Sequence, residues 1–288
     1  MPAIPESPSL SSPVSLPPLR DVIKRFRLGA RRSLGQHFIL DLNLCARITR
    51  AAGDILASTV IEIGPGPGGL TRALLDAGAA KVIAVERDER CVAALAELAE
   101  AYPERLEIIE GDALEADLVG LTGPPRCIVS NLPYNIATPL LIGWLQHIGD
   151  FERLTLMFQQ EVAARLAARP GTREYGRLSI ITQWLCDVRR EFNVDGRAFT
   201  PPPKVASAVV TLNPRLKPLA PAAWDALETV TAAAFGQRRK MLRASLKPLC
   251  LDPRELGIDP TKRAGELTVE EFCALARRHE QGLLSRSS

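Results

Sequence analysis

The chain has 288 residues, of which 46% are hydrophobic and 24% charged, and its formal net charge is +3. These proportions are ordinary for a globular protein and exclude a mainly disordered or fibrous chain. No apolar run approaches the roughly 18 residues of a membrane-spanning helix, and residues 1–20 lack the features of a targeting signal. Six scattered cysteines offer no zinc-ligand spacing, which predicts reduced thiols in a cytoplasmic protein.

The predicted elements begin with a tail. Residues 1–18 are mostly Pro and Ser and cannot bury enough apolar surface to offset their ordering entropy, so we expect them to be disordered. Residues 19–213 then alternate strands with helices. The predicted strands are Thr59–Ile63, Lys81–Glu86, Leu106–Glu110, Arg126–Ser130, Leu154–Phe158, Val188–Asn193 and Val205–Leu212, and two helices are predicted at Leu70–Ala77 and Glu89–Ala101. This alternation predicts a doubly wound α/β domain with a mostly parallel sheet.

The β signal ends near Pro214. Three helical segments follow, separated by Pro and Gly, at Trp224–Phe235, Lys240–Lys247 and Thr268–His279. Residues 214–288 are therefore predicted to form a small all-helical second domain.

A glycine-rich loop follows the first predicted strand of the sheet. Gly64, Gly66 and Gly69 have the spacing G-x-G-x-x-G, and Glu86 stands about twenty residues further on, at the end of the next strand. The glycines let the backbone approach a ligand closely, and Glu86 could accept hydrogen bonds from a ribose diol. This pattern suits NAD and S-adenosylmethionine equally, and a tight turn alone also explains a glycine cluster.

Two carboxylates favour S-adenosylmethionine over NAD. Glu62 lies two places before the glycine loop, a position typical of methyltransferases, and Asp112 follows the third strand of the sheet. Asp112 could accept from an adenine amino group, although an Asx turn or a helix cap would explain it if it stood alone.

The most specific motif is Asn131-Leu132-Pro133-Tyr134, which directly follows the fourth strand. At the carboxyl edge of a doubly wound sheet it faces the ligand crevice. The Asn side-chain oxygen and the carbonyl before the proline can both accept from an exocyclic amine such as adenine N6, and Tyr134 can stack on an extruded base. Positioning and electrostatics would then carry the rate without a strong general base. The alternative is a plain proline turn.

Basic residues gather toward the two ends of the chain. Residues 20–50 carry a net charge of about +6 and residues 200–288 about +5, whereas residues 51–199 carry about −7. The spacing of Arg238, Arg239 and Arg243 predicts that they share part of one helical face. Such a face suits contacts with RNA phosphates, and a solvated helix face is the alternative.

At these residues the sequence resembles the small-subunit ribosomal RNA adenine N6,N6-dimethyltransferases. The resemblance covers nearly everything after the tail. It runs through LGQHF (34–38), EIGPGPGGLT (62–71), VERD (85–88), GDAL (111–114), NLPYNIATPLL (131–141), MFQQEVAARL (157–166), YGRLS (175–179), FTPPPKVASAVV (199–210) and FGQRRKMLRASLK (235–247). It implies a Rossmann-like class I methyltransferase domain followed by a C-terminal helical RNA-binding domain.

The resemblance also implies a reaction and a set of residues. The reaction is transfer of four methyl groups from S-adenosylmethionine, two to each of two adjacent adenines near the 3′ end of small-subunit rRNA in the immature subunit. The implied cofactor residues are His37, Ile39, Gly64, Glu86, Asp112 and Asn131, and the implied catalytic segment is Asn131, Leu132, Pro133 and Tyr134. The implied RNA-binding residues are Arg31, Arg32, Arg238, Arg239, Lys240, Arg243 and Lys247. The family more often has Asn and Leu at the positions of His37 and Ile39, and it contacts the cofactor there mainly through backbone.

Two other functions also fit the sequence. The segregated basic ends would also suit an RNA-binding assembly factor that senses an immature subunit, and the NLPY motif would suit an adenine methyltransferase of DNA or of another RNA. Phe158 and Phe199 could enclose the base or could be core aromatics. The chain is expected to be a monomer that needs no metal and no membrane.

Overall fold

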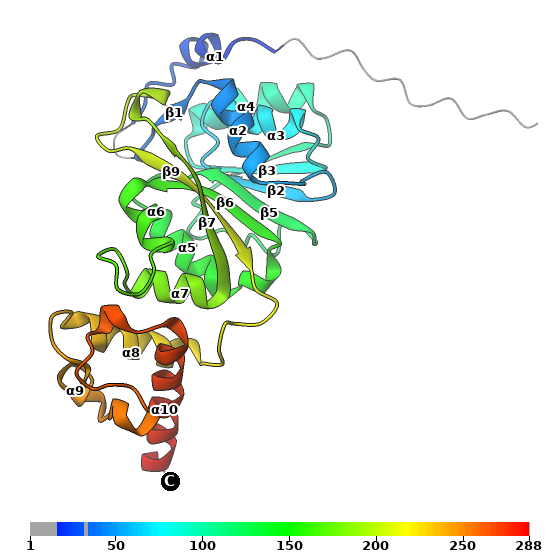
Figure 1. The fold of residues 1–288 in the computed structure, drawn as a ribbon. Helices are drawn as coiled ribbons and strands as arrows, with labels where there is room; N and C mark the ends of the chain where they lie inside the picture. Colours follow the sequence, from blue (N-terminus) through cyan, green and yellow to red (C-terminus); the bar gives the residue numbers. More distant parts are fainter. Residues whose placement is uncertain (1–15, 32–33, 288) are drawn as a thin grey trace, which may run out of the picture.

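A seven-stranded sheet forms the centre of the larger part of the molecule, which is described by a computed structural model covering residues 16–31 and 34–287 (Figure 1). Its strands are β2 (Thr59–Ile63), β3 (Lys81–Glu86), β4 (Leu106–Glu110), β5 (Arg126–Asn131), β6 (Arg153–Gln159), β7 (Cys186–Val194) and β9 (Ser207–Pro214). They lie in the order β4-β3-β2-β5-β6-β9-β7, parallel from β4 to β6, with β9 antiparallel to β6 and to β7. The predicted doubly wound α/β sheet is confirmed.

The central strands are buried on both faces. In β2 the successive residues Val60 and Ile61 are both fully buried although their side chains point to opposite faces. A near-continuous apolar run is what a parallel strand covered on both sides requires. The chain leaves β2 toward β3 and β4 on one side, and toward β5 and β6 on the other. The strand order therefore reverses at β2, where such sheets open a crevice at their carboxyl edge.

Helices cover both faces of the sheet. One face packs against α2 (Leu42–Ala51), α3 (Gly69–Asp76) and α4 (Glu89–Ala101), and the other against α5 (Ala137–Gln146), α6 (Gln160–Leu166) and α7 (Arg177–Leu185). Asp88 is the N-cap of helix α4, and its carboxylate accepts from the backbone N–H of Arg90. This cap places the start of α4 directly beyond the end of β3.

Three helices follow the last strand and lie together below the sheet in Figure 1: α8 (Trp224–Gly236), α9 (Leu242–Ser245) and α10 (Val269–Ser287). Their buried side chains belong to the same apolar cluster as those of α5 and α7. The loop before α7 adds polar contacts, because the Gly171 N–H donates to the Gly265 carbonyl at 2.7 Å. The helical part is thus packed onto one face of the α/β part.

The helical segment predicted at Lys240–Lys247 is wrong in extent. Helix α9 has only four residues, and Arg238 and Arg239 lie in the turn after α8. At the start of the expected helix, Met241 forms an antiparallel bridge with Arg263, a long-range contact that the local sequence does not predict; at its end, Lys247–Leu249 form a separate 3-10 turn. The predicted cationic helical face is therefore also wrong, although these basic side chains are exposed.

The N-terminal segment reaches the rest of the fold through two short elements. Helix α1 (Leu19–Arg25) leads to β1 (Phe38–Ile39), which pairs antiparallel with β8 (Phe199–Thr200). Most of the predicted tail, residues 1–15, lies outside the described residues, but the Pro17 carbonyl accepts from Arg72 Nη1 at 2.6 Å. The predicted tail therefore does not extend through Pro18.

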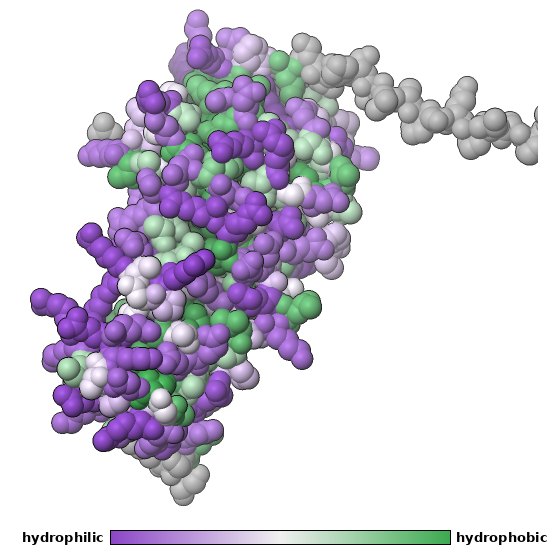
Figure 2. All heavy atoms as spheres, in the orientation of Figure 1, coloured by the Kyte–Doolittle hydropathy of each residue, from purple (hydrophilic) through white to green (hydrophobic). Residues whose placement is uncertain are grey.

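Hydrophilic side chains predominate on the face of the molecule that Figure 2 displays, and hydrophobic ones show through in separate small areas. In the described part of the chain, no helix combines the length and the apolar character that crossing a membrane would require.

Candidate active site

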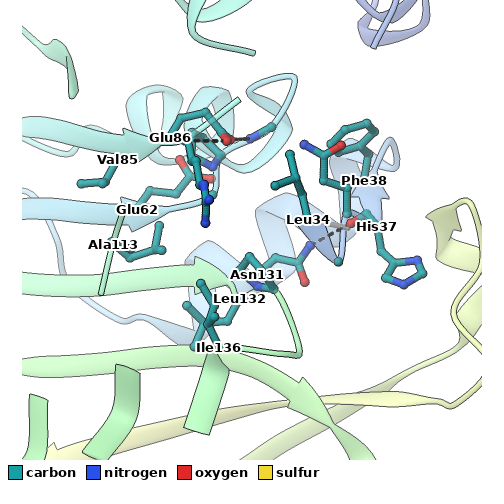
Figure 3. Close-up of a pocket in the computed structure, with 18 of the residues that line it drawn as sticks. Leu34, His37, Phe38, Glu62, Val85, Glu86, Ala113, Asn131, Leu132 and Ile136 are labelled. Carbon is teal, nitrogen blue, oxygen red and sulfur yellow. Dashed lines mark hydrogen bonds between the residues drawn. The ribbon is translucent and has the colours of Figure 1, made fainter. Parts of the chain in front are cut away.

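A cavity lies at the carboxyl ends of β2, β3 and β5, where the strand order reverses (Figure 3). Five separate stretches of chain line it: 34–39, 62–70, 85–87, 111–113 and 131–136. The first carries β1, and the others follow or end four neighbouring strands of the sheet. The topology therefore gathers the glycine loop, the three carboxylates singled out in the sequence (Glu62, Glu86 and Asp112) and the NLPY segment around one space.

The glycine loop needs its glycines. Gly66 has a φ of +58°, a conformation that costs an L-residue roughly 1–2 kcal/mol, and a Cβ there would lie 2.9 Å from the Phe38 ring. Gly64 also has a positive φ of +65°, and a Cβ on it would lie 3.4 Å from the Pro133 ring. The loop thus packs against both β1 and the NLPY segment without a side chain between them.

Glu86 ends β3 and is buried at the cavity wall. One carboxylate oxygen accepts from the backbone N–H groups of Arg87 and Asp88, and the other accepts from that of Gly66 at 3.0 Å. Burial raises the pKa of Glu86, and these three bonds oppose the rise. A carboxylate offers about four acceptor positions, so roughly one remains, on the oxygen that faces the glycine loop. Glu86 can accept one further hydrogen bond from a ligand.

Glu62 lines the same cavity from β2 and is only 2% exposed. Its carboxyl accepts from the Thr71 hydroxyl at 2.6 Å. Burial raises the pKa of Glu62 to about 8, the Thr71 bond opposes the rise, and the carboxylate of Glu86 adds to it. Near neutral pH the carboxyl of Glu62 is therefore mainly protonated. The neighbouring carboxylate of Glu86 accepts three hydrogen bonds from backbone N–H groups.

Asp112 lies at the edge of the cavity, just after β4. One of its oxygens accepts from the Leu114 N–H at 3.0 Å, which is the Asx turn that the sequence left open as an alternative. The other oxygen pairs with Arg87 Nη1 at 3.0 Å. The side chain is 28% exposed, so the turn leaves it within reach of a ligand.

Asn131 is the last residue of β5, and its side chain is held from one side. Its Nδ2 donates to the His37 backbone carbonyl at 3.1 Å, as the dashed line in Figure 3 shows. This bond leaves the side-chain oxygen Oδ1 as the acceptor available to a ligand. Leu132 and Pro133 both line the cavity; Leu132 is buried, and Pro133 lies against the glycine loop.

Tyr134 is held at both its hydroxyl and its ring. The hydroxyl shares a hydrogen bond of 2.5 Å with Ser207 Oγ on β9, and burial raises the pKa of the phenol. The His37 ring stacks on Tyr134 with centroids 5.5 Å apart and planes inclined by 30°. Sequence reasoning did not find Ser207, which lies in a quoted motif but carries no catalytic signature. Phe158 and Phe199 are buried core aromatics.

Gln36 was also missed as a contributor to the site. Its side-chain amide donates to Asp88 Oδ2 at 2.9 Å, and its oxygen accepts from the Arg31 N–H. Arg90 also pairs with Asp88 at 2.6 Å, and these contacts lower the pKa of Asp88 to about 2. The Gln36–Asp88 hydrogen bond thereby connects residues 34–38 to the turn that follows Glu86.

The predicted RNA-binding side chains are exposed wherever the structure describes them. They are Arg31, Arg238, Arg239, Lys240, Arg243 and Lys247; Arg32 lies outside the described residues. Arg238 also has an internal role, since Nη2 donates to the carbonyls of Thr172 and Arg173 in the loop before α7. Arg31 lies far from the basic residues of the C-terminal helices, because the two belong to opposite ends of the fold (Figure 1).

The chain matches the ribosomal RNA adenine dimethylase family over residues 27–281. A protein of Rhodospirillum rubrum named ribosomal RNA small subunit methyltransferase A is 65% identical over 266 residues, covering 91% of this chain and 92% of the relative. A protein of the same name from Paramagnetospirillum magneticum is 65% identical over 265 residues, covering 91% and 94%.

The chain is also similar to solved structures. A dimethyladenosine transferase from Plasmodium falciparum superposes with a TM-score of 0.73 at 27% identity, covering 85% of this chain and 98% of that one. The 23S rRNA methyltransferase ErmE superposes with a TM-score of 0.66 at 30% identity, covering 85% and 100%. The fold, the site and the extent of these matches lead to one conclusion: the chain belongs to the ribosomal RNA adenine dimethylase family.

Proposed function

We propose that this protein uses S-adenosylmethionine to dimethylate the N6 amino groups of two adjacent adenosines near the 3′ end of small-subunit rRNA, within the immature small subunit. The observation that carries the proposal is the placement of Asn131. Its carboxamide sits at the carboxyl end of β5, is oriented by the His37 carbonyl, and borders the cavity that Glu86 also lines. Family membership and the names of the relatives support the choice of rRNA as substrate.

The residues around the cavity fit S-adenosylmethionine. Glu86 has one acceptor position left for a ribose hydroxyl, and Asp112 is partly exposed for the adenine amino group. His37 and Ile39 offer backbone beside the glycine loop, where Gly64 has no side chain to obstruct a ligand. When bound, the cofactor supplies an electrophilic methyl group on a sulfonium.

The NLPY segment prepares the amine that receives the methyl group. The N6 lone pair of adenine is delocalised into the ring, which makes it a poor nucleophile. Asn131 Oδ1 and the carbonyl of Leu132 accept from the amino group and favour a pyramidal nitrogen, while Tyr134 stacks on the base. No strong general base is required, because the nitrogen becomes acidic as it gains the methyl group. Positioning and electrostatics carry the rate.

The remaining parts serve the RNA. We infer a methyltransferase domain at residues 19–213 and a helical RNA-binding domain at residues 214–288, acting as a monomer in the cytoplasm. The exposed basic residues of the turn after α8 and of α9 contact phosphates, which positions the RNA without reading its sequence.

Radiolabelled S-adenosylmethionine tests the proposal with undermethylated small subunits, naked rRNA and duplex DNA as substrates. We expect label in the subunits and loss of that label on replacing Asn131 with Ala. Label in DNA instead would show another adenine methyltransferase. No label in any sample, with tight subunit binding, would favour an RNA-binding assembly factor.

A further inference from the structure

His37 contacts two members of the NLPY segment at once. Its backbone carbonyl accepts from Asn131 Nδ2 at 3.1 Å, and its imidazole stacks on the Tyr134 ring at a centroid distance of 5.5 Å. In Figure 3 the imidazole points away from Glu86 and the cofactor side of the cavity. The side chain of His37 therefore belongs to the substrate side of the site, while its backbone lies between the substrate side and the cofactor side.

The small β1–β8 sheet explains why the imidazole stays there. Phe38 pairs with Thr200 and Ile39 with Phe199, so the antiparallel register carries His37 toward Pro201. His37 Nδ1 lies 2.7 Å from the Pro201 carbonyl, which can only accept, so Nδ1 carries the hydrogen. The Phe199 ring meets the imidazole edge-on at 6.5 Å. The imidazole is thus held by a hydrogen bond on one side and by two aromatic rings.

This arrangement limits the freedom of Tyr134. The Ser207 bond fixes the tip of the phenol but permits the ring to turn about the axis through its hydroxyl. The imidazole on the ring face removes that freedom. The plane of Tyr134 decides where a stacked adenine lies, and small misplacements of reacting atoms cost up to about 100-fold in rate.

We propose that His37 is a positioning residue: its imidazole sets the plane of Tyr134, and its anchorage to Pro201 steadies the carbonyl that orients Asn131. The inference rests on the proposed function and deepens it, because it assigns the His37 side chain to the target adenine rather than to the cofactor. On this assignment only the His37 backbone remains for contact with the cofactor.

Kinetics with undermethylated subunits distinguishes a role of the His37 side chain toward the target adenine from a role toward the cofactor. We expect His37→Ala to lower kcat about 10- to 100-fold while S-adenosylmethionine affinity, measured by titration calorimetry, stays within about twofold. His37→Phe keeps a ring against Tyr134 and should recover part of kcat. His147→Ala, which removes an exposed histidine beyond the C-terminal end of α5, is the matched control and should behave as the wild type. Cofactor affinity that falls in step with activity, or full activity of His37→Ala, would overturn the proposal.

A second readout does not depend on activity. The chain has three tyrosines, so ring-labelled tyrosine gives few NMR signals, and Tyr134→Phe identifies the one of interest. We expect His37→Ala to move or broaden the Tyr134 signal alone. An unchanged Tyr134 signal would overturn the positioning role even if the wild type proved inactive on rRNA, whereas wild-type inactivity with a changed signal would refute only the proposed function.

Discussion

Replacing Glu62 with Gln should change how the stability of the protein depends on pH. The carboxyl of Glu62 is 2% exposed, and burial raises its pKa from 4.5 to about 8. Between these values the unfolded chain loses the proton while the folded chain keeps it. The free energy of unfolding contributed by this group is therefore fully present below pH 4.5 and is lost as the pH rises through 8.

The size of the effect follows from the same two values. At 1.36 kcal/mol per pKa unit, the loss is about 3 kcal/mol by pH 7 and about 4 kcal/mol by pH 8, and its limit at higher pH is about 5 kcal/mol. Gln cannot ionise, yet its side-chain oxygen can still accept from Thr71. The variant should match the wild type to within about 1 kcal/mol near pH 5 and become clearly more stable than it at pH 8.

Urea denaturation of both proteins between pH 5 and pH 8.5, without cofactor, measures this difference. Taking the difference between variant and wild type cancels the titration of other groups. Glu110→Gln, which neutralises an exposed carboxylate on β4, is the matched control and should show no such trend. A constant difference between the Glu62 variant and the wild type across the range would show that folding does not raise the pKa of Glu62.

Three further changes test other parts of the structure. Gly66→Ala should lower stability by roughly 1–3 kcal/mol and weaken S-adenosylmethionine binding in calorimetry, because the new Cβ meets the Phe38 ring at positive φ; unchanged affinity would contradict the packing of the loop. Asp88→Asn should lower the free energy of unfolding, measured with urea, by about 2 kcal/mol at pH 7 and by little at pH 2. The low pKa of Asp88 contributes stability above pH 3.8 that is lost as the pH falls to about 2. An equal loss of stability at both pH values would contradict the low pKa of Asp88. Arg238→Ala should speed hydrogen exchange in the loop before α7, because it removes the hydrogen bonds to the carbonyls of Thr172 and Arg173, whereas Arg239→Ala should not; equal exchange in the two variants would show that these bonds do not hold the loop.

The parts of the fold that local sequence predicts well are the central parallel strands. The bounds of β2, β3 and β4 agree with the predicted ones because each is a β-branched or alternating apolar run that ends at a glycine or an acidic residue. The NLPY segment was predictable for the same reason, since it directly follows such a run. The chemistry of its residue types then indicates the amine that it can bind.

Features that depend on distant partners could not be predicted in this way. The helix expected from Lys240 begins only at Leu242, directly after Met241 pairs with the distant Arg263. Contact between His37 and Tyr134 depends on the pairing of two-residue strands about 160 positions apart, which leaves no periodic signal. Residue spacing likewise could not show that three backbone N–H groups already occupy most of the acceptor positions of Glu86.

In the proposed reaction, the carboxamide of Asn131 activates adenine N6 for methyl transfer from a cofactor held beside Glu86. Mass spectrometry of nucleosides from undermethylated small subunits, incubated with S-adenosylmethionine and each protein, tests this role of Asn131. The wild type and Asn193→Ala, a control on the edge strand β7, should both produce N6,N6-dimethyladenosine. Even at saturating S-adenosylmethionine, Asn131→Ala should yield at most about one hundredth of the product. Wild-type amounts of dimethyladenosine from Asn131→Ala would contradict the claim.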